Sequence, residues 1–381
     1  MKAINYILIL FLFLTSCSKD KESGNDMSGG PSSDGSHKVG GGKTGMTAGE
    51  WNDLDSWSFW QNLMSDASYK KFVNQWGFNT QNRISVLALG SDSLPIVDYK
   101  IELYQNASVF ASGKTDNKGR IDFFIHPSQI TGPLNINDFS LKLPQINYSK
   151  SNLILFDSGL NVLHLAEVSV KPEAIDLAFV VDATGSMGDE MEYVKTELYD
   201  VINRVKARNP NSILNTGAVF YKDDGDEYVS KFSQFTADNS NTISYIKAQS
   251  ADGGGDWPEA VHTALNSAIN DLNWSASAKT RILFLVLDAP PHFNENVIAS
   301  LSASLKKAKE KGIKIIPIAA SGVDQETEFL LRAFSIASNG TYVFVTNDSG
   351  IGDDHLKPTV GHFEVEFLKD LMVRLINEYA E

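Results

Sequence analysis

Residues 174–188 constrain the fold of this chain more than any other stretch, because a buried strand there runs into a polar loop. Residues 174–181 are mostly apolar, with β-branched and aromatic side chains, which is typical of a central strand in a parallel sheet. Asp182, Thr184 and Ser186 follow, and apolar residues then recur at helical spacing from 191 to 205. We therefore predict a strand, a tight loop and a helix. In open parallel sheets, ligands bind at this place, beyond the carboxyl ends of the strands.

The oxygen side chains of that loop can converge on one hard cation. Mg²⁺ prefers octahedral oxygen ligands and keeps several waters, so a carboxylate and two hydroxyls at alternate positions suit it. The alternative is an N-capping loop whose hydroxyls satisfy helix amides. Asp182-x-Thr184-x-Ser186 resembles the metal-ion-dependent adhesion site of von Willebrand factor A (vWA) domains, whose pattern is Asp-x-Ser-x-Ser. The threonine is a conservative departure from that pattern.

Strands and helices alternate through the rest of this half of the chain. The expected strands cover residues 214–221, 228–235, 281–287, 313–318 and 341–345. The expected helices cover residues 243–248, 259–272, 298–308, 329–337 and 368–379. Such alternation predicts an α/β fold with a doubly wound, mostly parallel sheet. The vWA resemblance covers the whole of this predicted domain, residues 171–381.

Two further loops of this domain offer oxygen ligands. Asp256 lies in a glycine-rich loop that ends at Pro258, and Asp288 follows the strand 281–287, where a turn or cap acid is the alternative. The resemblance implies a ligand at Asp256, where the family often has threonine, and an aspartate that reaches the metal through water at Asp288. Whether Asp256 contacts the metal directly stays open. The predicted metal ligands are Asp182, Thr184, Ser186, Asp256 and Asp288, with Mg²⁺ as the cofactor, or else Mn²⁺ or Ca²⁺.

The resemblance implies a non-catalytic binding module, in which an acidic residue of a protein partner replaces a water on the metal. The sequence has no Gly-x-Ser-x-Gly elbow, phosphate loop or His-Glu-x-x-His. A metal-assisted phosphoester hydrolase and a structural scaffold of an envelope complex are the alternatives. The net charge of -14 argues against nucleic acid as a partner. Residues 221–227 form an acidic turn, either simply solvated or a rim that favours a basic partner.

The amino terminus predicts export and lipid anchoring. Residues 1–16 have a basic start and a short apolar run, as in a signal peptide. Leu14-Thr15-Ser16-Cys17 resembles a bacterial lipobox, in which the cysteine carries the lipid, and Cys17 is the only cysteine. Residues 17–49 are rich in Gly, Ser, Asp and Lys and predict a flexible tether. We expect a membrane protein of the cell envelope, at the outer membrane or cell surface.

Two segments lie between the tether and the predicted vWA domain. Residues 50–82 are aromatic-rich and predict a helix packed on a neighbouring domain, with an exposed aromatic platform as the alternative. Residues 83–170 contain short strands of period two and predict a small all-β sandwich domain. The hairpin at 115–121, together with the strands before it, resembles bacterial carboxypeptidase-regulatory-like modules. We assign no chemistry to this domain.

Overall fold

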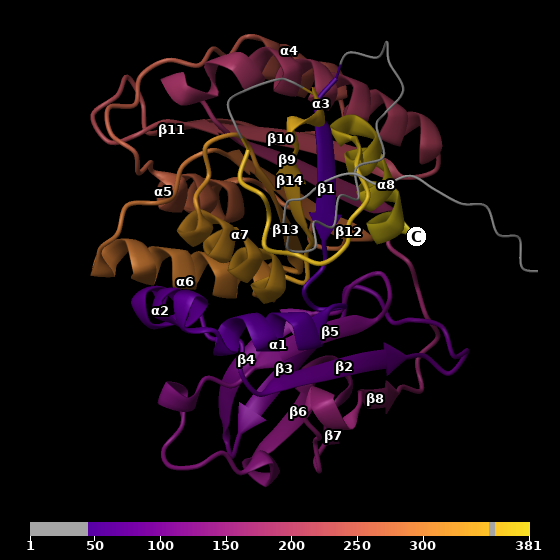
Figure 1. Ribbon diagram of the computed structural model, residues 1–381. Coiled ribbons are helices and arrows are strands. Elements are labelled where there is room, and N and C mark those ends of the chain that lie inside the picture. The colour runs from indigo at the N-terminus through magenta and orange to yellow at the C-terminus, as the bar shows by residue number, and fades with distance from the viewer. Residues whose placement is uncertain (1–44, 350–354) are drawn as a thin grey trace, which may run out of the picture. The chain divides into compact units, whose positions relative to one another are not determined.

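The computed structural model describes residues 45–349 and 355–381 (Figure 1). The predicted signal peptide, Cys17 and most of the predicted tether lie outside the described residues. None of the helices described is long and apolar enough to span a bilayer.

One mixed sheet of eight strands organises the second half of the chain. Its strands are β1 (Thr47–Trp51), β9 (Ala174–Asp182), β10 (Ile213–Tyr221), β11 (Ser230–Thr236), β12 (Thr280–Leu287), β13 (Ile313–Ala319), β14 (Tyr342–Val345) and β15 (Glu366–Phe367). The order across the sheet is β11-β10-β9-β12-β13-β14-β1-β15. The strands from β10 to β14 are parallel to their neighbours, whereas β11 and β1 pair antiparallel at the two sides. The predicted doubly wound, mostly parallel α/β fold is confirmed.

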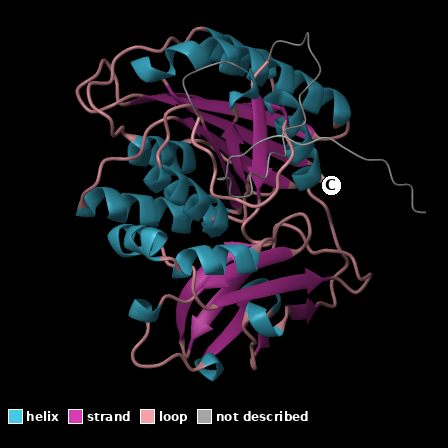
Figure 2. Cartoon of the chain, viewed as in Figure 1, coloured by secondary structure: helices cyan, strands magenta, loops and turns pink. Residues whose placement is uncertain are grey.

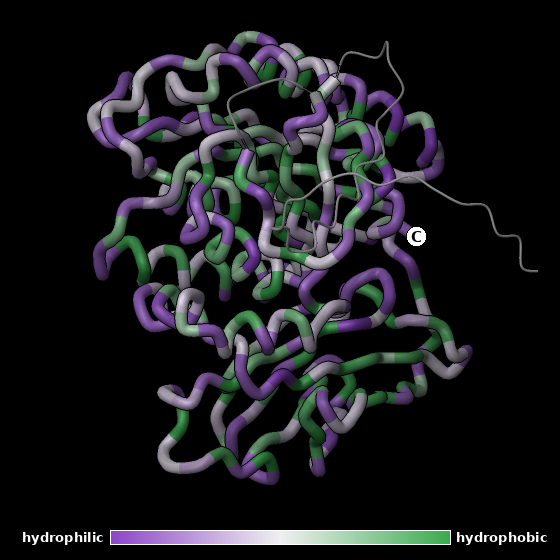
Figure 3. The backbone as a smooth tube through the Cα atoms, in the orientation of Figure 1, coloured by the Kyte–Doolittle hydropathy of each residue, from purple (hydrophilic) through white to green (hydrophobic). Residues whose placement is uncertain are grey.

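Helices cover both faces of this sheet (Figure 2). They are α3 (Gly188–Arg208), α4 (Asn239–Lys247), α5 (Val261–Asn266), α6 (Glu295–Lys311), α7 (Gln325–Ala337) and α8 (Leu368–Ala380). Two further helices, α1 (Trp57–Ser65) and α2 (Ala67–Trp76), pack on α7 instead of on the sheet. Successive residues of β9 enter different cores: Phe179 packs with α3 and α8, and Val180 packs with α5, α6 and α7. Since strand side chains alternate between faces, an apolar strand of this kind needs cover on both sides. Hydrophobic colour accordingly runs along the central strands in Figure 3.

The strand β1 shows that the predicted tether boundary at residue 49 is wrong. Residues 48–51 pair with β14 and Thr47 pairs with β15, and Thr47 and Ala48 are buried. Ala48 packs in the same core as α8, a contact that a composition rich in glycine and serine does not reveal. The large sheet therefore includes a strand from the N-terminal side of the sandwich.

The aromatic segment after β1 packs against α7, which covers the large sheet. Trp60 and Phe72 stack on Phe329 of α7, with ring centroids 6.2 and 5.8 Å apart. Trp57 is also buried, under the Arg83 guanidinium at 4.8 Å. The segment thus forms two packed helices where a single one was expected, and these tryptophans do not form an exposed platform.

Two small sheets form the segment between α2 and β9. The first has the order β5-β2-β8 and the second β4-β3-β6-β7. Their strands are β2 (Arg83–Leu89), β3 (Lys100–Gln105), β4 (Ser108–Lys114), β5 (Arg120–Phe124), β6 (Phe139–Leu143), β7 (Tyr148–Lys150) and β8 (Asn161–His164). A separate apolar core, which includes Val86, Leu103 and Phe123, lies between them. The pairing is antiparallel except between β2 and β8.

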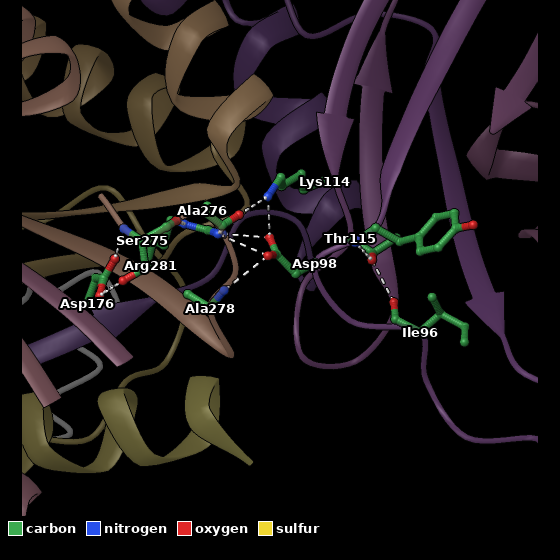
Figure 4. Close-up of polar contacts among 10 residues, drawn as sticks. Ile96, Asp98, Lys114, Thr115, Asp176, Ser275, Ala276, Ala278 and Arg281 are labelled. Atoms are coloured by element: carbon green, nitrogen blue, oxygen red, sulfur yellow. Dashed lines mark hydrogen bonds and ion pairs between the residues drawn. The ribbon is translucent and has the colours of Figure 1, made fainter. Parts of the chain in front are cut away.

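The sandwich contacts the amino-terminal edge of the large sheet (Figure 4). Asp98 accepts two hydrogen bonds from Arg281 at 2.6 and 3.0 Å, and the amide of Ala278 donates to it at 3.1 Å. Lys114 lies 3.0 Å from the same carboxylate. Because Arg281 is near the start of β12, this contact lies at the opposite edge from Asp182, the last residue of the neighbouring β9. The sandwich therefore leaves the predicted site uncovered.

The buried Lys309, which also contacts the sandwich, should make the stability of the protein depend on pH. It lies on α6 and donates to the backbone oxygen of Asp122 at 2.6 Å, and burial lowers its pKa from 10.5 to about 8. Between those values the unfolded chain binds more protons than the folded one, so this residue's contribution makes stability rise with pH. We expect the stability of the wild type, relative to Lys309→Met, to improve by about 2–3 kcal/mol from about pH 7 to about pH 10. Urea unfolding at both pH values measures it, and a constant difference would contradict the assignment.

Candidate functional site

The loop after β9 brings its three predicted residues together. The backbone amide and the hydroxyl of Thr184 both donate to Asp182 Oδ1, at 2.9 and 2.7 Å. The Thr184 and Ser186 hydroxyl oxygens are 3.2 Å apart. Neither the 3-10 turn Gly185–Met187 nor α3 has a side-chain cap at its start, so the N-capping alternative does not describe this loop. Asp182 and Thr184 are buried, while Ser186 is exposed to solvent.

Two buried carboxylate oxygens without hydrogen-bond partners lie beside the Thr184 and Ser186 hydroxyls. Asp182 Oδ2 and Asp288 Oδ1 are buried and have no hydrogen-bond partner in the described part of the chain, although the Tyr221 hydroxyl is near Asp182. Burial, reinforced by repulsion from Asp288, raises the pKa of Asp182 to about 7. Burial raises the pKa of Asp288 to about 6, against the effect of a hydrogen bond with Ser186. An unpaired buried charge is costly, so a cation held here would relieve both acids.

In the glycine-rich loop, Glu259 is buried whereas the predicted ligand Asp256 is exposed. Asp256 is exposed, and its carboxylate forms no hydrogen bond or ion pair with the residues described. Glu259 is only 3% exposed, and its Oε2 atom has no partner among them. Burial, followed by repulsion from Asp182 and Asp223, raises the pKa of Glu259 to about 9. Sequence reasoning missed this acid because it follows Pro258, where an acid also suits a first helical turn.

Close backbone contacts hold the three loops against one another. Gly254 adopts φ +69°, and a Cβ atom there would lie 3.0 Å from Glu259 Oε1 and 3.2 Å from Thr184 Cβ. Gly254 also donates its amide to Asp226 at 2.9 Å. The amide of Glu259 donates to the oxygen of Pro290 at 2.9 Å, two residues beyond Asp288. A side chain at Gly254 would therefore displace the loop that carries Glu259 from the loop that carries Thr184.

The donor set fits a cation that keeps much of its water. No group of three or more His, Cys, Asp or Glu side chains in residues 45–349 and 355–381 is placed to hold a metal ion by itself. A cation at this edge would depend on the Thr184 and Ser186 hydroxyls beside Asp182, with water completing the shell. Mg²⁺ binds in this way, since it dehydrates reluctantly.

The fold and the site define an α/β domain with an oxygen-rich loop at the carboxyl edge of its central strand. Residues 176–350 match the von Willebrand factor A domain family. The chain therefore contains a vWA domain, as the loop sequence predicted. The matched segment includes every predicted metal ligand.

Two curated relatives each match about a third of this chain. An ariadne-like RING finger protein of Acanthamoeba polyphaga mimivirus is 33% identical over 122 residues, which is 32% of this chain and 12% of the relative. The alpha-protein kinase vwkA of Dictyostelium discoideum is 28% identical over 144 residues, which is 38% of this chain and 22% of the kinase. The chain thus spans less than a quarter of either relative's length.

Two solved structures from Bacteroides species are similar over about half of this chain. They are BatB from Bacteroides thetaiotaomicron, with a TM-score of 0.38, and an aerotolerance-related membrane protein from Bacteroides fragilis, with a TM-score of 0.36. Each is 14% identical and covers 54% of this chain, and the similarity includes 98% and 99% of those chains.

Proposed function

We propose that the vWA domain binds a protein partner through a divalent cation, Mg²⁺ above all, without catalysis. Asp182, Thr184 and Ser186 would hold the cation, with Asp288 acting through water. The observation that carries the proposal is the pair of buried, unpartnered oxygens on Asp182 and Asp288 beside two hydroxyls. When bound, the cation supplies an open position that a partner's carboxylate can take from water. Mn²⁺ or Ca²⁺ would suit the same oxygens.

The experiment that tests this proposal compares partner capture with and without the cation. The full chain is immobilised and exposed to a cell-envelope extract with millimolar Mg²⁺ or with EDTA, and Asp182→Ala is treated in parallel. We expect proteins that are retained only by the wild type and only with Mg²⁺. Retention that is equal in all four conditions would contradict the proposal.

A metal-assisted phosphoester hydrolase is the second candidate, and one contact favours it. His292 Nε2 lies 2.6 Å from Asp223 Oδ1, a pairing that can hold a histidine as a general base. If the domain is an enzyme, the wild type turns over phosphoesters with Mg²⁺, and His292→Ala and Asp182→Asn both abolish the reaction. We expect no turnover by any of the three proteins.

Hydroxyl substitutions distinguish a ligand oxygen from a nucleophile. Thr184→Ser keeps the oxygen and should retain Mg²⁺ binding, whereas Thr184→Ala and Ser186→Ala should each weaken it. The loss should be partial, because water can replace one ligand of Mg²⁺. Calorimetric titration with Mg²⁺ measures the affinities. Equal affinity in Thr184→Ala and the wild type would exclude this hydroxyl from the site.

We propose further that the chain is exported and anchored to a membrane of the cell envelope through lipid on Cys17. The support is the sequence Leu14-Thr15-Ser16-Cys17 and the basic, apolar start of the chain. We expect Cys17→Ser to leave an unprocessed or released protein. Fractionation after carbonate and high-salt washes measures this, and a variant processed normally and still held by the membrane would contradict it.

A further inference from the structure

We infer that the partner presents a basic segment, with lysines or arginines around an apolar side chain, to the loops beside Asp182. The inference rests on the proposed function for the place of the cation, but the charge and shape of these loops carry it independently. We call residues 184–190, 222–229, 250–260 and 288–294 the acidic edge. The acids exposed on it are Asp189, Asp224, Glu227, Asp252 and Asp256.

Few positive charges balance these acids, and Lys231, just beyond the acidic edge, lies over the Tyr228 ring at 3.9 Å. The sequence of the acidic edge contains no arginine, and Lys222 is its only lysine. Lys222 is buried and forms an ion pair with Asp252, and the only histidine, His292, is paired with Asp223. The acidic edge thus attracts cations and repels anions before any specific contact forms.

Two further observations, independent of the exposed acids, indicate a ligand here. Trp257 is 46% exposed and Phe293 is 55% exposed, although large aromatic side chains are normally covered. The loops that carry them are joined by a bridge between Glu259 and Pro291, two residues from each ring. Glu259 itself is nearly fully buried, with an unpartnered oxygen close to Asp223 and Asp226. Exposed aromatic residues near unsatisfied buried acids are typical of a binding surface.

Charge complementarity selects a basic protein segment over the other possible occupants. Nucleic acid and anionic lipid carry the same sign of charge as the acidic edge. A second copy of this chain would bring the same acids to the interface. A basic segment would gain from both features, since its cations meet the acids and its apolar side chain meets Trp257 and Phe293. A single carboxylate within such a segment could still reach the cation.

Synthetic peptides test this inference with the full chain. The probe is a short fluorescent peptide with one central glutamate flanked by lysines and leucines, and the comparison peptide has glutamates in place of the lysines. Fluorescence anisotropy with Mg²⁺ should show binding of the lysine peptide alone, weakened by salt. Asp224→Asn with Glu227→Gln should weaken binding about two- to tenfold at low salt, the range expected for two charges at a rim.

The matched control removes the same charge elsewhere. Glu173 and Asp271 are exposed and lie toward the opposite edge of the sheet. Glu173→Gln with Asp271→Asn should leave binding of the lysine peptide within about twofold of the wild type, because distant exposed charges are screened. Trp257→Ala should weaken binding at every salt concentration, since its contribution is apolar. Equal loss in the two charge variants, or equal binding of both peptides, would overturn the inference.

The arm with EDTA separates this inference from the proposed function. If the lysine peptide binds with Mg²⁺ and more weakly with EDTA, both are supported. If binding is the same in EDTA but still depends on Asp224, Glu227 and Trp257, the basic partner stands and the role of the cation is contradicted. If Mg²⁺ binds by calorimetry and no basic peptide does, the inference fails and the metal site stands.

Discussion

Millimolar Mg²⁺ should raise the melting temperature of the wild type, and the rise should vanish in Asp182→Asn. A ligand that binds only the folded state stabilises it by about 2.7 kcal/mol at a hundredfold excess over its dissociation constant. Asp182 supplies the charge beside the two hydroxyls, so its removal should cost most of the affinity. Calorimetric melting of the full chain with and without Mg²⁺ measures both results.

The order of stability of the wild type and Asp182→Asn should reverse when the cation is removed. In EDTA, Asp182 and Asp288 repel each other across a buried site, and each has an unpartnered oxygen. Asn has the shape of Asp and can still accept from Thr184, so Asp182→Asn removes the repulsion and keeps those hydrogen bonds. We therefore expect the variant to be as stable as the wild type or more so in EDTA, and less stable with Mg²⁺. A variant that is less stable by the same amount in both conditions would show that Asp182 acts through the fold alone.

The central part of the fold could be predicted from the sequence because its strands are apolar on both faces. Strands such as β9 and β12 read as short continuous apolar runs, and the helices between them show the period of 3.6 residues. The sandwich strands are harder to delimit: β4 (Ser108–Lys114) has only one buried residue and no clear alternation of buried and exposed positions. It pairs antiparallel with β3 across a two-residue turn, with Gln105 opposite Ser108.

The candidate site was predictable where its residues lie close together in the sequence. Asp182, Thr184 and Ser186 share one loop, so the strand before it fixes their arrangement. The acid of the glycine-rich loop was assigned to Asp256, but which acid turns inward depends on how Gly254 and Pro290 pack around Glu259. That packing is a property of three loops together and is absent from any one of them.

A buried ion pair next to β1 could not be predicted from the sequence either. Asp53 looks like an ordinary turn acid in the sequence, yet the structure places it against Arg332 of α7, and both side chains are fully buried. Arg332 donates to both Asp53 oxygens, at 2.9 and 2.6 Å, and also to the backbone oxygen of Thr359. This pair fastens the segment before the sandwich to the vWA domain. No local pattern could reveal a pairing between residues 279 positions apart.

Asp53→Leu should destabilise the protein by about 3–5 kcal/mol, because it leaves the Arg332 guanidinium buried without its principal counter-charge. Glu328 lies 3.6 Å from Arg332 but already accepts hydrogen bonds from Tyr69 and Thr359, so it cannot fully replace Asp53. Arg332→Met should cost a similar amount, because it leaves Asp53 unpaired. Urea unfolding measures each free energy.

The double variant Asp53→Leu with Arg332→Met decides what the pair contributes. Removing both charges removes both desolvation penalties, so the double variant should be more stable than either single variant by at least about 1 kcal/mol. Arg374→Met provides the exposed control: Arg374 forms ion pairs with Glu50 and Glu366 but is 38% exposed, and its loss should cost no more than about 1 kcal/mol. If the two single losses simply add in the double variant, Asp53 and Arg332 stabilise the fold through separate contacts, and the segment before the sandwich is held by its aromatic packing on α7 instead.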